Sequence, residues 1–474
     1  MKAVLINPYV PVEVIYGKTF AAQSVVLPPL GILYLASYLK DKYNVEVLDA
    51  NALRQRPADV EKYIFQNDFD CVGFSVTTLS YPYAVEIAEN IRKASAGIKL
   101  VIGGVHAQGD YKSILSEYPG LFDFVCYGEG EYALESLLDY LSGKVSKEKL
   151  LGWSYLENGN MVTTQVASIP ENLDIFGHPA EVISRDYVKL YHEKILAYKE
   201  LPMFSVITSR GCPFQCTFCS TPQKFNSLYN KKIRYHSVEW ICDELMLLKE
   251  KYGVREVIFV DDTFNFRRER ILEFCEAILK KNIRIKWTCN FKAHISDIEM
   301  LKKMKKAGCW GIMIGAESGS NEILKLIKKG VTTEQVRLVG EMADSVGIFL
   351  KVSFIIGLAG DTKETIEKTI SFAKSPGFHF PYFQLYIPLP GTEMFNQLPK
   401  YGRIINLVGS KKTSVSSVNF IPNGLTEEYL LDAFNRAYKE VYLRWQMVGN
   451  HLKFIRSFTD LKHYLKGLRL LAQI

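Results

Sequence analysis

The sequence contains no apolar run long enough to cross a membrane. Its longest candidate, PLGILYLASYL at residues 29–39, falls well short of the roughly 18 apolar residues that indicate a transmembrane helix. The N-terminal segment MKAVLINP also lacks the basic region, apolar block and small-residue cleavage site of a secretory signal peptide. These two absences predict a cytoplasmic protein.

Cysteine is scarce and its number is odd, with nine in 474 residues. In a large chain without a secretion signal, this argues for a reducing compartment and against a disulfide framework. Short-period repeats and low-complexity tracts are absent as well. The formal net charge of +7 is mild, so a solubility excess explains it more simply than a nucleic-acid surface, and we expect no nucleic-acid partner.

The first 140 residues alternate short apolar strands with helical patterns, which predicts a doubly wound, Rossmann-like parallel sheet. In such sheets, ligands bind at the carboxyl ends of the strands. The expected strands are 2–8, 44–50, 71–78, 99–107 and 123–129, and the expected helices are 30–42, 57–67, 81–95, 110–117 and 131–142.

A second alternating series follows and predicts a partial (β/α)6 barrel. Its expected strands are 203–209, 256–262, 284–290, 310–318, 350–358 and 381–389, with helices at 237–252, 267–281, 333–346 and 362–374. Between the two series, the Asn158-Gly159 pair predicts a tight hairpin within residues 154–164. We therefore divide the chain into a Rossmann-like domain (1–142), a connecting region (143–200), a barrel (201–400) and a helical C-terminal region (401–474).

Three cysteines fall within eight residues in the segment CPFQCTFC, at Cys212, Cys216 and Cys219. A structural zinc site is the first alternative, but it needs a fourth ligand and usually pairs two Cys-x-x-Cys units, and no partner pair exists here. Three thiolates would instead leave one iron of a four-iron, four-sulfur cluster open to bind a ligand directly. The uneven spacing suits a loop that wraps one cluster, placed just after the first barrel strand.

This segment resembles the signature of the radical S-adenosylmethionine (SAM) superfamily, Cys-x-x-x-Cys-x-aromatic-Cys, with Phe218 as the aromatic residue. The resemblance continues in order over residues 203–395. FVDDTFN (259–265) is similar to the segment that meets the methionine part of SAM, IGAESGS (314–320) to the ribose motif, FIIGLAGDT (354–362) to the glycine motif beside adenine, and PLPGTEMF (388–395) to the sixth strand end. The SAM-binding residues that the resemblance implies are Phe218, Asp261, Asp262, Glu317, Ser318 and Gly357.

The resemblance implies an enzyme whose cluster holds the amino and carboxyl groups of SAM. One electron from an external reductant of the flavodoxin or ferredoxin type then releases a 5′-deoxyadenosyl radical. The remaining cysteines fall mostly in apolar patterns, so we expect them to be buried as small hydrophobic residues.

A doubly wound domain ahead of the barrel resembles the cobalamin-binding class of radical SAM enzymes, which includes methyltransferases and the anaerobic tetrapyrrole cyclase. The implied cobalamin-binding residues are Asn51, Ser75, Thr77, Thr78, Gly103, Gly104, His106, Gly128, Glu129 and Gly130. One departure concerns Asn51, which stands where many members have the histidine that binds cobalt from below. An amide is a poor cobalt ligand, so we expect cobalamin without a protein histidine beneath it, and His106 at the corrin or phosphate edge.

Several functions fit these motifs. The leading one is methylation of an unactivated carbon in a small-molecule or lipid-like substrate. A radical cyclisation, oxidation or ring contraction with the same cofactors is the alternative, and a non-catalytic cobalamin or redox sensor is a third. RNA methylthiolation is disfavoured, because that family has a second cysteine triad in the first domain, where only Cys71 and Cys126 lie.

The C-terminal stretch 451–474 spaces five bulky apolar residues at alternating steps of four and three, which predicts a helix with one apolar stripe. It also holds five Lys and Arg residues against one acid, Asp460. Two interpretations stay open. The helix packs on the barrel with a basic outer face, or it lies on an anionic membrane, which would place the protein at the inner face of the membrane.

Overall fold

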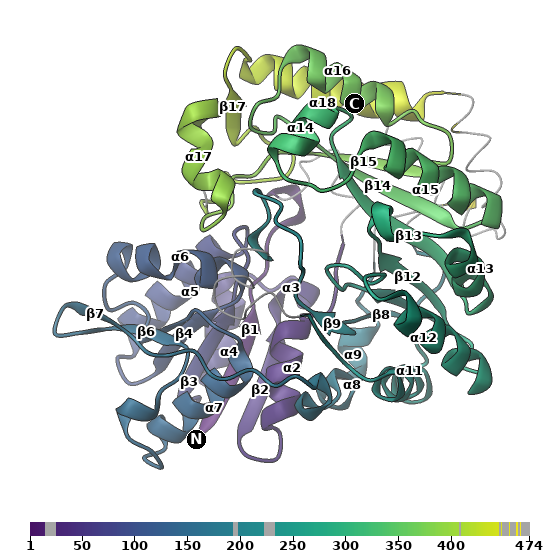
Figure 1. Ribbon diagram of the computed structural model, residues 1–474. Helices are drawn as coiled ribbons and strands as arrows, with labels where there is room; N and C mark the ends of the chain where they lie inside the picture. The colour runs from purple at the N-terminus through teal and green to yellow at the C-terminus, as the bar shows by residue number, and fades with distance from the viewer. Residues whose placement is uncertain are drawn as a thin grey trace.

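The computed structural model describes residues 1–14, 25–192, 198–221, 233–406 and 409–444, together with the single residues 447, 455, 461, 462 and 465. Two β-sheets dominate the described chain (Figure 1). The first, purple to blue, lies at the lower left of the view, and the second, teal to green, lies at the right. The two series of strands predicted from the sequence therefore form two separate sheets.

The first sheet has the strand order β2-β1-β3-β4-β5-β6-β7, and its first five strands are parallel. Successive residues of β1 serve different cores: Val4 and Ile6 belong to one hydrophobic cluster, Ala3 and Leu5 to another on the opposite face. Helices cover both faces, which confirms the doubly wound prediction. The elements are β1 (Lys2–Asn7), α2 (Leu30–Leu39), β2 (Asn44–Asp49), α3 (Ala50–Leu53), α4 (Pro57–Gln66), β3 (Cys71–Ser75), α5 (Tyr81–Ala94), β4 (Lys99–Gly103), α6 (Val105–Glu117), β5 (Phe124–Cys126) and α7 (Gly130–Leu141).

Three strands of this sheet are clearly shorter than predicted, and the strand expected at 123–129 spans only Phe124–Cys126. The strand expected at 71–78 ends at Ser75, and the strand expected at 99–107 ends at Gly103. Helix α6 then begins at Val105 and not near residue 110. Gly104, with a φ of 90°, turns the backbone from strand to helix within one residue, so His106 lies in the first turn of α6.

The predicted hairpin is present as β6 (Trp153–Glu157) and β7 (Asn160–Thr163), joined by Asn158 and Gly159 with φ of 50° and 79°. β6 pairs antiparallel with β5, so the hairpin extends the first sheet. Short helical turns complete the segment before the barrel: η2 (Lys147–Lys149), η3 (Leu173–Phe176), α8 (Pro179–Val182) and α9 (Arg185–Val188).

The second sheet has six parallel strands in the order β15-β14-β13-β12-β11-β8, which confirms the partial barrel. The predicted strand 256–262 ends early, at Phe259, so Asp261 and Asp262 lie beyond the strand. The strands are β8 (Met203–Val206), β11 (Glu256–Phe259), β12 (Lys286–Asn290), β13 (Cys309–Glu317), β14 (Phe349–Ile356) and β15 (Phe380–Leu385). The helices are α11 (Val238–Tyr252), α12 (Arg268–Lys280), η4 (Ala293–Ile295), α13 (Ile298–Lys306), α14 (Asn321–Leu326), α15 (Thr333–Val346), α16 (Lys363–Phe372) and α17 (Glu393–Tyr401).

The C-terminal region is not wholly helical as expected. It begins with an antiparallel pair, β16 (Gly402–Ile404) and β17 (Phe420–Pro422), before α18 (Glu427–Tyr442). The helix expected at 451–474 falls almost entirely outside the described residues. Within the described part of the chain, no helix combines the length and apolarity needed to span a bilayer.

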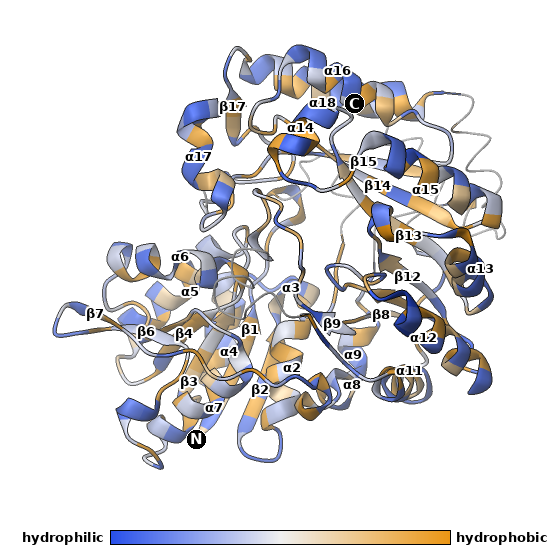
Figure 2. Cartoon of the chain, viewed as in Figure 1, coloured by the Kyte–Doolittle hydropathy of each residue, from blue (hydrophilic) through white to orange (hydrophobic). Residues whose placement is uncertain are grey.

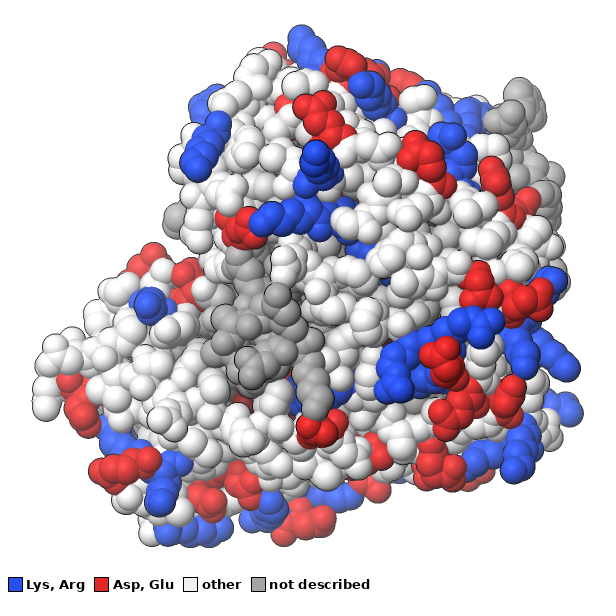
Figure 3. All heavy atoms as spheres, in the orientation of Figure 1, with Lys and Arg blue, Asp and Glu red and all other residues white. Residues whose placement is uncertain are grey.

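Hydropathy and charge follow this architecture. In Figure 2, hydrophobic residues gather along the strands of both sheets, while hydrophilic residues dominate the outer faces of helices such as α12 and α13. On the face shown in Figure 3, Lys and Arg lie interspersed with Asp and Glu. The mild positive charge is therefore not concentrated in one basic surface on that face.

Candidate active site

The three signature cysteines share one cavity of about 260 Å³. We call it the cysteine cavity, and the described residues 211–221 the cysteine loop. Backbone hydrogen bonds from Thr217 N to Ile327 O (3.0 Å) and from Met394 N to Thr217 O (2.8 Å) fix the loop over the barrel. Ends of several parallel strands also line the cavity, so the thiols sit on the ligand-binding face of the barrel.

The donor set of this cavity fits an iron–sulfur cluster, whose irons take different thiolates. All three cysteines are free thiols. Among the described residues, no three His, Cys, Asp or Glu side chains are placed to hold a single metal ion. Burial raises the pKa of Cys212 and raises the pKa of Cys219 to about 11. Iron binding to these thiols would therefore release protons.

The two aspartates of FVDDTFN have different surroundings. Asp261 is buried, and its carboxylate accepts hydrogen bonds from the backbone N of Thr208 (3.1 Å), the hydroxyl of Thr208 (2.7 Å) and the hydroxyl of Ser209. It thereby anchors the chain that leads into the cysteine loop. Asp262 is exposed within the cysteine cavity, where its carboxylate lies 3.5 Å from the Thr221 hydroxyl. Of the two, Asp262 is the one positioned to meet a ligand there.

Glu317 lies at the end of β13 with its side chain on the cysteine cavity. It is buried and pairs with Lys329, with Nζ 2.6 Å from Oε1. Its φ of 63° is in the left-handed region, which costs a non-glycine residue about 1–3 kcal/mol. A Cβ on Gly315 would lie 2.2 Å from Glu317 Oε1, so the pair depends on a glycine at 315.

Two polar residues of the cysteine cavity were not predicted, because in the sequence they look like ordinary surface residues. Lys292 is buried and donates to Lys329 O at 2.7 Å, and burial together with Lys329 lowers its pKa to about 8. Asn290 donates to Asp261 O at 3.0 Å, but its Oδ1 is buried without a hydrogen-bond partner among the described residues. An unpartnered acceptor on a cavity wall fits a ligand with amino and hydroxyl donors, such as SAM.

The remaining SAM residues implied by the resemblance divide into two groups. Phe218 lines the cysteine cavity and packs against the cluster of buried residues around Ile323 and Leu358. Ser318 and Gly357 do not line it: the Ser318 hydroxyl contacts Thr369 of α16 at 3.2 Å, and Gly357 N donates to the buried Asp361 carboxylate at 3.1 Å.

A second cavity, of about 400 Å³, lies over the carboxyl ends of the first sheet. We call it the glycine cavity. Six of the predicted cobalamin residues line it: Ser75, Gly103, Gly104, Gly128, Glu129 and Gly130. A Cβ on Gly104 would lie 2.6 Å from Val76 N, and one on Gly130 would lie 2.9 Å from Leu35 Cδ2, so the lining is bare because side chains do not fit. This backbone surface fits a large flat cofactor.

The other four predicted cobalamin residues lie outside the lining of the glycine cavity. The Thr77 hydroxyl contacts Ser80, and the Thr78 hydroxyl contacts His106 Nδ1 at 3.3 Å. His106 is buried beside the ring of Tyr81, 4.4 Å between centroids. Asn51 Oδ1 accepts from Val10 N at 3.4 Å. No histidine is among the described residues that line the glycine cavity.

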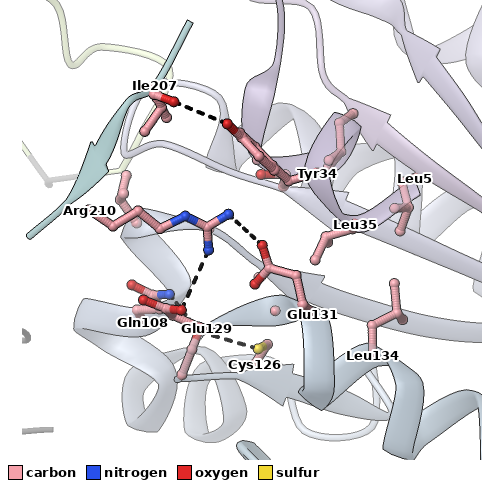
Figure 4. Close-up of a pocket in the computed structure, with 18 of the residues that line it drawn as sticks. Leu5, Tyr34, Leu35, Gln108, Cys126, Glu129, Glu131, Leu134, Ile207 and Arg210 are labelled. Carbon is pink, nitrogen blue, oxygen red and sulfur yellow. Dashed lines mark hydrogen bonds and ion pairs between the residues drawn. The ribbon is translucent and has the colours of Figure 1, made fainter. Parts of the chain in front are cut away.

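The two cavities meet. Thr221 and Asp262 line both, so the cysteine loop and the end of β11 form a common wall. Arg210, also in the glycine cavity, binds Glu131 with Nη2 2.6 Å from Oε1 and lies 3.5 Å from Glu129 (Figure 4). Burial lowers the pKa of Arg210, but Glu131 and Glu129 outweigh burial and raise it above its usual value. Apart from its place next to the cysteines, nothing in the sequence pattern marks this arginine as a site residue.

Comparison with known families supports both halves of this arrangement. Residues 206–373 match the radical SAM superfamily, and residues 20–138 match the B12 binding domain. The chain is 32% identical over 441 residues to an uncharacterized methyltransferase of Pyrococcus horikoshii, with 93% of each protein covered. It is 26% identical over 428 residues to an anaerobic magnesium-protoporphyrin IX monomethyl ester cyclase of Rubrivivax gelatinosus, with 88% of this chain and 74% of the relative covered.

Among solved structures, the chain is similar to the cobalamin-dependent S-adenosylmethionine radical enzyme OxsB with aqua-cobalamin bound. The TM-score is 0.64 at 21% identity, over 84% of this chain and 55% of that one. At this identity, the likeness concerns the fold. The chain spans about half the length of that enzyme.

Proposed function

The chain belongs to the radical SAM enzymes that carry a B12-binding domain, and on this premise we propose that it methylates an unactivated carbon of a small-molecule or lipid-like substrate. Its cofactors are a four-iron, four-sulfur cluster, SAM and cobalamin. An enzyme of this family also needs an external one-electron reductant. When bound, the cluster and SAM supply a carbon-centred radical, and cobalamin supplies the methyl group.

The observation that carries the proposal is the shared wall of the two cavities. A substrate carbon has to meet both the radical and the methyl donor, so the two sites must open onto one space. Thr221 and Asp262 line both cavities, which supports such a space between the cysteine loop and the first sheet. In this proposal, Asp262 faces the substrate, while Asp261 holds the start of the cysteine loop.

The test is anaerobic incubation of the reconstituted protein with cobalamin, isotopically labelled SAM and cell extract, followed by mass spectrometry. Methyl transfer predicts a labelled product together with deoxyadenosine and S-adenosylhomocysteine in comparable amounts. One relative is a cyclase, so a reaction without methyl transfer is the second outcome to look for. Deoxyadenosine without S-adenosylhomocysteine would reassign the enzyme to radical cyclisation, oxidation or ring contraction.

We also propose Cys212, Cys216 and Cys219 as the cluster ligands. Replacing any one with Ala is expected to abolish the visible iron–sulfur absorption and deoxyadenosine formation together. The matched control is Cys242→Ala, because Cys242 is a free thiol on the buried side of α11 and lines neither cavity. Zinc without iron in the anaerobically purified protein would overturn this assignment.

For cobalamin, we propose a lower face without a protein histidine. The support is Asn51 at the position of the usual ligand and the absence of histidine among the described residues of the glycine cavity. Electron paramagnetic resonance of the cob(II)alamin form is expected to show no nitrogen superhyperfine splitting from a protein imidazole. A clear nitrogen triplet that persists with a base-off cobalamin analogue would contradict the proposal.

Two partner interactions complete the proposal: a reductant of the flavodoxin or ferredoxin type, and contact of residues 451–474 with an anionic membrane. The second rests on the sequence pattern of that stretch alone. Co-sedimentation with anionic and neutral vesicles, at low and high salt, compares the full chain with one that ends at Asn450. Salt-sensitive binding of the full chain alone supports membrane contact, and equal negligible binding rules it out.

A further inference from the structure

A two-residue strand pair lies directly before the cysteine loop. β9 (Ser209–Arg210) pairs antiparallel with β10 (Arg234–Tyr235), so that Arg210 stands opposite Arg234. A further hydrogen bond, from His236 N to Thr208 O at 2.9 Å, continues the pairing. This pair is the base of the loop, and it places two guanidinium groups on one rung. Two like charges opposite each other destabilise a strand pair unless a counter-charge lies between them.

The counter-charge comes from the first domain. Glu129, which precedes α7, lies between the two arginines: its Oε2 is 3.5 Å from Arg210 Nη1 and 3.2 Å from Arg234 Nη1. Its Oε1 pairs with Arg234 Nη2. Glu131 holds the other side of Arg210, with Nη2 2.6 Å from Oε1. Arg234 and Glu131 are buried, and the side chain of Glu129 is 21% exposed, so the group is largely shielded from water.

Neighbouring contacts orient this group. The ring of Tyr34, on α2, lies 4.8 Å from the Arg210 guanidinium, and its hydroxyl donates to Ile207 O at 3.1 Å (Figure 4). On the other side, Gly128, Glu129 and Gly130 line the glycine cavity. One short segment of the first domain therefore touches the expected cobalamin surface and the base of the cysteine loop at once.

We infer that Glu129 is a positioning residue that clamps the base of the cysteine loop to the cobalamin domain. This inference rests on the proposed function, in which the loop carries the cluster. The clamp holds Cys212, two residues beyond Arg210, in a fixed place relative to the glycine cavity. In this role Glu129 acts through Arg210 and Arg234.

The test compares Glu129→Gln with Glu86→Gln in the anaerobically prepared full-length protein. Glu86 is a matched control because it also links the first domain to a later part of the chain, through Lys411 Nζ at 2.7 Å, but far along the chain from the cysteine loop. Hydrogen exchange is measured at residues 208–210 and 234–236, with and without reconstitution. Exchange there is expected to rise about tenfold or more in Glu129→Gln and to stay at the wild-type rate in Glu86→Gln.

The cluster gives a second readout. In Glu129→Gln, the electron paramagnetic resonance spectrum of the reduced cluster with SAM is expected to broaden, because the loop samples several positions. Glu129→Asp keeps the charge on a shorter side chain, so its exchange rates are expected to fall between those of wild type and Glu129→Gln. If Glu129→Gln does not fold, Glu129→Asp replaces it in the comparison with wild type.

The inference is overturned if exchange at both strands and the cluster spectrum stay unchanged in Glu129→Gln and Glu129→Asp. It is equally overturned if Glu86→Gln raises exchange as much, since the effect would then belong to domain docking in general. A wild-type protein that takes up no iron would refute the proposed function alone. The exchange comparison in the unreconstituted protein would still decide the role of Glu129.

Discussion

At the scale of residues, the cysteine cavity combines buried charge with backbone strain. Glu317 adopts a left-handed φ of 63°, and Lys329 neutralises it at 2.6 Å. Lys292 adds a second buried ammonium group, which donates a hydrogen bond to Lys329 O. Such charges are costly to bury without a compensating ligand, so the cavity is arranged for an anionic or zwitterionic occupant.

The Glu317–Lys329 pair is tested by Gly315→Ala. The new Cβ would lie 2.2 Å from Glu317 Oε1 and 2.8 Å from Lys329 Nζ, so the pair has to separate. Losing a charged hydrogen bond of about 1.5–3 kcal/mol predicts SAM binding weaker by about ten- to a hundredfold. Equilibrium dialysis with the reconstituted protein measures the dissociation constant of SAM. The control is Gly97→Ala, where the nearest atom to the Cβ is Ser95 Oγ at 3.9 Å. Equal SAM affinity in both variants would disprove a role for the pair.

Lys292 provides a second residue-scale prediction. Its ammonium group lines the same cavity as the thiols, and a nearby positive charge stabilises the reduced, more negative cluster. Lys292→Met is therefore expected to lower the cluster reduction potential, by up to about 70 mV for a charge about 10 Å away at an effective dielectric constant of about 20. A redox titration followed by electron paramagnetic resonance measures the shift. Lys302→Met, at an exposed position on α13, should leave the potential unchanged, and an unshifted potential in Lys292→Met would count against the prediction.

At the scale of elements, the alternation of strands and helices was predictable, and so was the position of the cysteines at a strand end. Continuous apolar strands and helical spacing are local signals that a single sequence carries. The strand ends were predicted too long, as at 71–78 and 99–107, because the residues beyond Ser75 and Gly103 are still apolar or β-branched although the backbone has turned. The turn is set by Gly104, whose φ of 90° has no counterpart in the hydrophobic pattern.

The polar partners of the site were not predictable, for a different reason. Lys292, Lys329 and Arg210 look like ordinary solvated charges in the sequence. Only the fold brings each of them to a buried partner, across separations such as the 79 residues between Arg210 and Glu131. Conversely, Ser318 belongs to a recognised motif, yet its hydroxyl contacts Thr369 and not the cavity.

The turn after β4 gives the element-scale prediction, with Gly104→Ala. The substitution combines a left-handed φ with a Cβ 2.6 Å from Val76 N, whereas Gly120→Ala has a similar φ of 79° and no atom within 4 Å. Gly120→Ala is expected to lower the free energy of unfolding by about 1 kcal/mol. Gly104→Ala is expected to lower it by about 1–3 kcal/mol more, because the backbone of Val76 has to move. Cobalamin uptake, followed by visible absorption, should fall only in Gly104→Ala. Equal cobalamin uptake and equal melting temperatures in the two variants would show that neither cobalamin binding nor stability depends on the close approach of Gly104 to Val76.

At the scale of the whole molecule, the first domain contacts the chain that follows each edge strand of the partial barrel. β8 and β15 are the two edges of the six-stranded sheet. Beyond β8, Arg210 meets Glu129 and Glu131, and beyond β15, Gly391 meets Gly109 of α6. Figure 1 shows the first domain beside both regions, with α6 below α17. The domain therefore bridges the open side of the barrel, where it would shield a reactive radical from hydrogen donors in solution.

The contact beyond β15 tests this bridging role through Gly391→Ala. A Cβ at 391 would lie 2.7 Å from Gly109 O and 3.0 Å from Gly109 Cα, at a φ of 77°, so α6 has to withdraw from the barrel. The Glu129 contacts beyond β8 are not altered by this substitution. The first domain is therefore expected to separate from the barrel only on the side of β15. The reductant and other hydrogen donors in solution then reach the radical and quench it to deoxyadenosine, so the ratio of deoxyadenosine to methylated product should rise from about one to about three or more. The matched control is Gly424→Ala, with a φ of 78° and no atom within 4 Å, which carries the same backbone cost without the contact.

Faster hydrogen exchange in α6 of Gly391→Ala, with wild-type exchange at residues 208–210, would locate the opening. An unchanged product ratio alongside faster exchange in α6 would mean that this side of the barrel is closed by something other than the first domain.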